Sequence, residues 1–113
     1  MIMLIDSHAH LDMPHFDADR DAVIARAQEA GVTAILTLGV DGASSQRAVA
    51  LAQQYEGVFA AVGIHPHEAQ HATPEDYKVL MGLAREREAN SIIAWGEIGL
   101  DYHYDHSPRD VQQ

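Results

Sequence analysis

Cysteine is absent from this sequence, and so is any long apolar run. Without cysteine, disulfides and thiolate-bound zinc are excluded, and any metal ion has to be held by histidine and carboxylate groups. The longest apolar runs, MIMLI and VFAAVGI, are much shorter than the roughly 20 residues that a membrane-spanning helix needs. No basic stretch precedes the first run as a secretory signal requires, so we expect a cytoplasmic protein with no membrane contact.

Positive charge is also scarce, with seven Lys and Arg residues against 17 Asp and Glu residues and a formal net charge of −10. Non-specific binding to nucleic acid depends on Lys and Arg displacing counterions from phosphates, so the composition argues against a broad electrostatic grip on it. A bound divalent cation can still attract phosphate, because it is often the largest local charge in a site. The charge balance therefore leaves a metal-dependent enzyme acting on nucleic acid open.

Four short apolar runs alternate with longer amphipathic segments, and they cover residues 1–6, 32–40, 58–65 and 91–99. Near-continuous apolar strands favour a parallel sheet covered on both faces, which is an α/β arrangement. The runs begin about 30 residues apart, a spacing that fits the units of a (β/α)8 barrel of roughly 250 residues. We therefore expect residues 1–113 to be a single incomplete domain, the N-terminal half of such a TIM barrel with the C-terminal half absent.

The segments between the runs carry helix-capping signals. Asp17 or Asp19 is expected to cap the first helix and Ser44 the second, with a glycine after the end of each. TPED predicts a third helix that begins at Thr73, with proline at the first helical position and an acid at the capping-box position. SPRD, at residues 107–110, repeats this signal and predicts the start of a fourth helix.

Two histidines, His8 and His10, follow the first apolar run in DSHAHLD. Residues two apart in a strand face the same side with their Cα atoms about 7 Å apart, so one cation can sit between the two imidazoles. The carboxyl ends of the strands form the face on which barrel enzymes build their active sites. The H-x-H pattern alone fits a pair of exposed loop histidines equally well.

Glu97 ends the fourth run between two glycines, in otherwise apolar surroundings. An ionised carboxylate there is costly unless it meets a cation or strong donors, although a Glu exposed at a strand end is the simple alternative. His65 ends the third run before Pro66, a position more often filled by a turn residue. Three of the four strand ends thus carry ligand-type side chains, and this convergence favours a metal site.

Weaker candidates lie close to these residues. Asp6 and Asp101 could orient a histidine ligand through a hydrogen bond, although Asp6 could instead bond to backbone. Three residues that closely follow the candidate ligands could line the site: Asp12, Tyr102 and His103. Three other histidines are expected to be ordinary loop residues: His15, His71 and His106.

Taken together, DSHAHLD, GIHPH and GEIGLDY resemble the signature of the TatD family of metal-dependent deoxyribonucleases, and GEIGLDY is the most specific of the three. The resemblance implies a barrel in which His8 and His10 bind one divalent metal, Glu97 is catalytic and bridges to a second, and His65 contacts the scissile phosphate. It implies Mg, Mn or Zn as cofactor and DNA as substrate, cleaved by a metal-activated water. The remaining ligands of the family, two histidines and an aspartate, belong to strands beyond the fourth.

Two other functions stay open. The same metal site could hydrolyse an ester or amide, such as an aminoacyl-tRNA ester, because a metal-activated hydroxide does not dictate its electrophile. The second open possibility is that the chain is a non-catalytic fragment, which binds metal weakly or serves as an interaction module. Three ligands make at most an open site, so we expect little or no nuclease activity from this chain alone. The unpaired strand edges of a half barrel also predict self-association.

Overall fold

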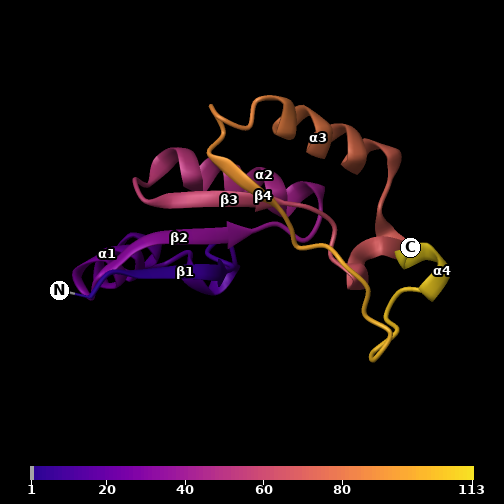
Figure 1. The fold of residues 1–113 in the computed structure, drawn as a ribbon, viewed down its shortest axis with the longest axis horizontal. Coiled ribbons are helices and arrows are strands. Elements are labelled where there is room, and N and C mark those ends of the chain that lie inside the picture. Colours follow the sequence, from indigo (N-terminus) through magenta and orange to yellow (C-terminus); the bar gives the residue numbers. More distant parts are fainter. Residues whose placement is uncertain (1) are drawn as a thin grey trace.

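A computed structural model describes residues 2–113, which form one four-stranded sheet with the order β1-β2-β3-β4 (Figure 1). Every pair of neighbouring strands is parallel. The strands are β1 Leu4–Ala9, β2 Val32–Leu38, β3 Val58–Val62 and β4 Ile92–Trp95. The prediction of four parallel strands in chain order is confirmed. Strand β1 starts and ends later than the first apolar run, so it contains His8.

Helical segments connect the strands and follow the last of them. The α-helices are α1 Arg20–Glu29, α2 Gly42–Gln54, α3 Pro74–Arg85 and α4 Arg109–Gln112. Two 3-10 helices, η1 Pro14–Phe16 and η2 Pro66–His71, lie in the loops that follow β1 and β3. Among residues 2–113, no helix is long and apolar enough to cross a membrane.

The core lies between the sheet and the crossover helices. Alternate residues of β3, namely Val58, Ala60 and Val62, are at most 2% exposed and pack with residues of α2 and α3. On the opposite face, Leu36 and Phe59 stay partly exposed. Since the helices pack on one face only, the expectation of a sheet covered on both faces is wrong for the described residues. A strand of a barrel instead turns its second face to the barrel interior.

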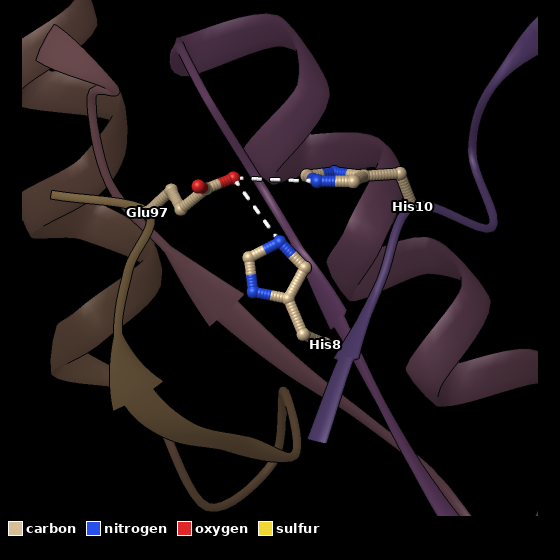
Figure 2. A group of neighbouring side chains, drawn as sticks. All are labelled: His8, His10 and Glu97. Atoms are coloured by element: carbon tan, nitrogen blue, oxygen red, sulfur yellow. Dashed lines mark ion pairs between the residues drawn. The ribbon is translucent and has the colours of Figure 1, made fainter. Parts of the chain in front are cut away.

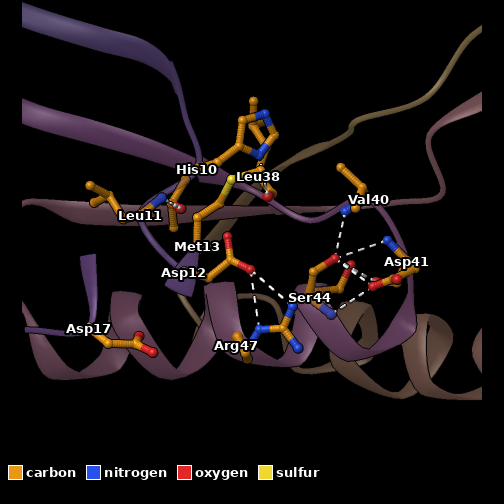
Figure 3. Close-up of polar contacts among 12 residues, drawn as sticks. His10, Leu11, Asp12, Met13, Asp17, Leu38, Val40, Asp41, Ser44 and Arg47 are labelled. Atoms are coloured by element: carbon orange, nitrogen blue, oxygen red, sulfur yellow. Dashed lines mark hydrogen bonds and ion pairs between the residues drawn. The ribbon is translucent and has the colours of Figure 1, made fainter. Parts of the chain in front are cut away.

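Of the two alternatives for α1, Asp19 is confirmed as the N-cap residue, whereas the predicted cap of α2 is wrong. The carboxylate of Asp17 accepts from Arg20 at 2.7 Å, and Asp19 occupies the N-cap position of α1 without a side-chain capping bond. In α2 the N-cap is Asp41, whose carboxylate accepts from the Ser44 backbone at 2.8 Å while the Ser44 hydroxyl bonds back to the Asp41 backbone at 3.0 Å (Figure 3). The helix therefore starts earlier than predicted, because the aspartate and serine form a capping box with reversed roles.

The capping box of α3 is confirmed, whereas α4 begins differently from the prediction. The Thr73 hydroxyl accepts from the Asp76 backbone at 3.2 Å and the Asp76 carboxylate accepts from the Thr73 backbone at 2.8 Å. In α4 the N-cap is Pro108, without a side-chain capping bond. Ser107 is instead fully buried, and its hydroxyl donates to the His67 carbonyl at 3.1 Å.

Backbone pairing continues past the ends of the strands and holds the following loops in register. The Glu97 amide donates to the Gly39 carbonyl at 2.7 Å, and the His65 amide donates to the Val40 carbonyl at 2.8 Å. Gly63 permits this close approach, because a Cβ there would lie 3.0 Å from the Glu97 carbonyl oxygen. The residues that follow β2, β3 and β4 are therefore fixed against one another.

Candidate metal centre

Three potential metal ligands meet at the carboxyl ends of the two edge strands (Figure 2). His8 lies near the end of β1, His10 comes directly after it, and Glu97 lies two residues beyond the end of β4. The Nε2 atoms of His8 and His10 lie 3.6 Å and 3.3 Å from the same carboxylate oxygen, Oε2 of Glu97. The donor atoms of the three residues all lie within 4.8 Å of one another, so this group could hold one metal ion.

The curl of the sheet creates this meeting point. Two strands separate β1 from β4 in the sheet, yet the side chains of His10 and Glu97 point toward each other across that gap (Figure 2). Strands in a barrel tilt and close around an axis, which brings residues of non-neighbouring strands together at one end. The predicted convergence of strand ends on one rim is thus observed for these residues.

His10 is oriented by a backbone carbonyl. Its Nδ1 atom lies 3.3 Å from the carbonyl oxygen of Leu38, at the end of β2 (Figure 3). Because a carbonyl only accepts, Nδ1 carries the ring proton in the neutral imidazole, and Nε2 keeps its lone pair. That lone pair faces Glu97. Histidines that bind metals commonly donate their other ring N–H in this way, which fixes the tautomer.

His65 shows the opposite tautomer. Its Nδ1 atom accepts a hydrogen bond from the backbone amide of His67 at 3.0 Å, so the proton of the neutral ring is on Nε2. Nε2 lies 3.5 Å from Oε1 of Glu97, the oxygen not shared by the histidine pair. Partial burial lowers the pKa of His65, against the opposing attraction of Glu97. His65 therefore presents a neutral N–H donor to the centre.

Asp101 has a histidine partner that the sequence did not single out. Its carboxylate lies 2.6 Å from Nε2 of His67 and also accepts from the backbone amides of His103 and Tyr104 at 3.1 and 3.2 Å. The hydrogen bond with His67 is the main reason why the pKa of Asp101 is lowered. Asp101 thus joins the loops after β3 and β4. His67 is the second histidine of GIHPH, and its position in that motif was the available signal.

The other acids near the histidine pair bind elsewhere. Asp6 accepts from the His8 backbone amide at 3.1 Å, which is the alternative that the sequence left open for it. The side chain of Asp12 is 7% exposed and pairs with Arg47 of α2 at 3.2 Å (Figure 3). The sequence did not predict this arginine contact, because 35 residues separate the partners.

The remaining histidines and tyrosines lie outside the group of three donors. His15 packs on Phe16, and His71 ends η2. The guanidinium carbon of Arg109 lies over the Tyr102 ring, 4.7 Å from the centroid of that ring. His103 and His106 pack with Tyr104 in the loop after β4. His106 is an exposed loop residue as expected, and its ring centroid lies 4.5 Å from that of His67.

Parallel βα units with imidazole and carboxylate donors at the carboxyl ends of the strands are typical of one class, the (β/α)8 barrels with a metal site at that end. Within that class, residues 5–113 match the family described as TatD related DNase, and the chain belongs to this family.

Named relatives agree with the family. An uncharacterized metal-dependent hydrolase, YabD of Bacillus subtilis (strain 168), is 39% identical over 111 residues, which are 98% of this chain and 42% of that protein. A 3'-5' ssDNA/RNA exonuclease TatD of Cronobacter sakazakii is 38% identical over 97% of this chain and 41% of its own length. The crystal structure of YjjV, a TatD homolog from Escherichia coli K12, superposes with a TM-score of 0.86 at 34% identity, over 96% of this chain and 42% of that one. The chain thus spans about two fifths of the length of these relatives.

Proposed function

We propose that His8, His10 and Glu97 bind a divalent metal ion, and that the complete protein carrying this chain is a deoxyribonuclease. The observation that carries the proposal is the arrangement of His10 and Glu97. Nε2 of His10 lies 3.3 Å from a carboxylate oxygen of Glu97, while Nδ1 is occupied by the Leu38 carbonyl. In the neutral ring the Nε2 lone pair and the carboxylate oxygen therefore face the same space, an arrangement that suits a shared cation.

The donor set fits a divalent transition metal or magnesium. Imidazole nitrogen suits Zn, Mn and Fe, and carboxylate oxygen also suits Mg. Glu97 directs one oxygen to the histidine pair, so its other oxygen would be available to hold a second ion in the complete protein. We propose two ions for the complete protein, with Mg, Mn or Zn as candidates.

Each side chain has a separate role in this proposal. A bound divalent ion supplies positive charge against phosphate and lowers the pKa of a water ligand toward neutrality. His8 and His10 hold the ion with neutral nitrogens, and Glu97, as the catalytic carboxylate, neutralises part of its charge. His65 is oriented to donate from Nε2 to an oxygen of the scissile phosphate, because its other nitrogen is occupied by the His67 amide.

Nucleic acid is the proposed substrate. A relative of this chain is named as an exonuclease acting on single-stranded DNA and RNA, and others as metal-dependent hydrolases. A phosphodiester also suits the centre chemically, because it has an anionic oxygen for the metal and another for the N–H of His65. We therefore assign DNA as the substrate and direct attack by water as the chemistry.

Several properties of the chain itself remain predictions. Residues 1–113 form one incomplete barrel domain in this proposal, and the three donors alone give little or no nuclease activity. The edge strands β1 and β4 carry exposed apolar side chains, including Ile5 and Ile93 at 72% and 64% exposure. These edges favour self-association, because unpaired backbone groups can pair with another strand. We also retain the cytoplasm as the predicted location.

Hydrolysis by the complete protein tests the proposed function. Single-stranded DNA is incubated with Mg²⁺ or Mn²⁺ beside an aminoacyl-tRNA ester, with wild-type protein and the Glu97→Gln variant. We expect metal-dependent release of nucleotides that Glu97→Gln reduces by at least about a hundredfold, because the variant removes the charged ligand. Ester hydrolysis without cleavage of DNA would overturn the assignment of substrate.

A further inference from the structure

A row of imidazole and aromatic rings leads from the candidate metal centre to an exposed tyrosine. His65, next to Glu97, has its ring centroid 4.3 Å from that of His67. The ring of His67 lies 4.5 Å from that of His106. His106 in turn stacks on Tyr104, with the centroids 5.6 Å apart and the planes inclined by 10°. The row is therefore continuous and joins the loops that follow β3 and β4.

Tyr104 has no role in the core that would explain its position. Its side chain is 64% exposed, whereas Tyr55 packs against the buried cluster. The Tyr104 ring stacks on His106, and its centroid lies 4.6 Å from that of the His103 ring, with the two planes inclined by 75°. An exposed aromatic ring fixed in this way offers a flat apolar surface on which another planar group can stack.

The turn that carries Tyr104 is held by hydrogen bonds at both ends. The Asp101 carboxylate accepts from the Tyr104 amide at 3.2 Å and from the ring of His67 at 2.6 Å. The side chain of Gln112 bonds to both the amide and the carbonyl of Asp101, at 2.7 and 3.1 Å. Ser107 ties the end of the turn to the His67 carbonyl at 3.1 Å. A ligand that stacks on Tyr104 therefore meets a surface that is already ordered, which reduces the entropy lost on binding.

The carboxylates beside Tyr104 are paired. Asp101 is bonded to His67, and Asp105 accepts from Nε and Nη2 of Arg109 at 3.0 and 3.1 Å. This pairing matters in a chain with a formal net charge of −10, because unpaired acids would repel a phosphate backbone. The surface next to Tyr104 therefore combines an aromatic face with carboxylates that are already engaged by His67 and Arg109.

We infer that Tyr104 is a stacking platform for an unpaired base of single-stranded nucleic acid whose backbone leads along this row to the metal centre. The inference rests on the proposed function, and it names the feature of the substrate that the loop after β4 recognises. Stacking on an aromatic ring accepts any base, since every base has a π face. It also favours single strands, because the bases of a duplex are stacked on their neighbours.

Oligonucleotide binding to this chain tests the inference. Fluorescence anisotropy in the presence of Mn²⁺ gives the Kd for a labelled single-stranded hexathymidylate and for an abasic hexamer with the same phosphates. We expect wild type to bind the hexathymidylate about tenfold more tightly than the abasic strand. Tyr104→Ala should remove this difference and leave the affinity for the abasic strand unchanged. Tyr104→Phe keeps the ring and should keep the preference within about twofold.

Tyr77 provides the matched control, because it is a comparably exposed tyrosine, at 57%, on α3. Tyr77→Ala should leave both Kd values unchanged. Equal affinities of wild type for the two strands, or equal loss of both in Tyr104→Ala, would overturn the inference. The Mn²⁺ affinities of wild type and His10→Ala, measured beside these Kd values, separate the two proposals. Loss of the base preference in Tyr104→Ala supports the stacking platform. Mn²⁺ binding that His10→Ala does not alter overturns the metal centre, and the two results can occur independently.

Discussion

His10 and His65 direct the same ring nitrogen, Nε2, at opposite oxygens of Glu97, but in the neutral rings their backbone partners assign it opposite states of protonation. The Leu38 carbonyl keeps the proton of His10 on Nδ1, and the His67 amide keeps that of His65 on Nε2. One histidine therefore offers a lone pair and the other offers a proton. The first suits a cation and the second suits an anion, which separates a metal ligand from a phosphate-binding residue.

This difference can be measured directly by NMR. Long-range ¹H–¹⁵N correlation spectra of the metal-free chain at neutral pH should show a proton on Nδ1 of His10 and on Nε2 of His65. Addition of Zn²⁺ should shift Nε2 of His10 and leave the tautomer of His65 unchanged, because only His10 offers a lone pair there. The same tautomer for both rings would contradict the assigned roles.

The bond between Asp101 and His67 should make the stability of the chain depend on pH. Because the pKa of Asp101 is lowered in the folded chain, mainly by this bond, its contribution is present above the ordinary carboxyl pKa of 3.8. That contribution disappears as the pH falls through the folded value. Asp101→Asn should therefore have a lower urea midpoint than wild type at pH 7. The two midpoints should become equal when the pH falls below the folded pKa of Asp101. A difference between the two midpoints that does not change with pH would contradict this.

The helix caps predict a graded series of stabilities. Thr73→Ala and Asp41→Ala each remove a side-chain bond to a backbone amide at a helix start, and each should cost about 1 kcal/mol of unfolding free energy. Asp19→Ala is the matched control, because Asp19 occupies an N-cap position without making such a bond. Its cost, measured by urea denaturation, should stay below about 0.5 kcal/mol. Equal costs for all three would show that the capping bonds do not stabilise the helices.

Gly63 controls the position of Glu97 although it is no ligand itself. A Cβ at Gly63 would lie 2.8 Å from a side-chain carbon of Ile98 and 3.0 Å from the Glu97 carbonyl oxygen. Gly63→Ala should therefore displace Glu97 and weaken Mn²⁺ binding by roughly tenfold, the lower end for loss of residues that orient ligands.

Gly82→Ala serves as the control for this substitution. Gly82 lies in α3 with nothing within 4 Å of an added Cβ, so alanine there should leave Mn²⁺ binding unchanged. It should also stabilise the helix by up to about 1 kcal/mol. Unchanged Mn²⁺ affinity in Gly63→Ala would show that the close approach does not position the carboxylate.

The sequence was sufficient to predict parallel strands in chain order, because its four apolar runs are separated by helical segments long enough for crossover connections. The Thr73–Asp76 capping box was equally readable, since both partners belong to one four-residue motif. Ser44 was misassigned because its hydroxyl can serve at either of two capping positions, and Asp41 decides between them. The uncovered second face of the sheet depends on barrel curvature, which periodicity does not report.

Some residues of the candidate site were predictable from the sequence, whereas their contacts with loops and backbone were not. His8 and His10 followed from strand spacing, and Glu97 from the cost of an unpartnered carboxylate. The contact of His67 with Asp101 joins two loops, and the contact of His106 with Tyr104 lies within one of them. The backbone of these loops is irregular, so residue spacing does not predict where a side chain points. The Leu38 carbonyl was equally out of reach, because no side-chain pattern indicates which backbone oxygen a histidine will meet.

Mn²⁺ binding to this chain tests the metal centre most directly, with free Mn²⁺ followed by electron paramagnetic resonance. Wild type is compared with His10→Ala and Glu97→Gln, and with His15→Ala as the control, because His15 packs on Phe16 away from the three donors. We predict a loss of affinity of at least roughly tenfold in the first two variants and none in the third. Mn²⁺ affinity that is the same in all four proteins would contradict a metal centre at His8, His10 and Glu97.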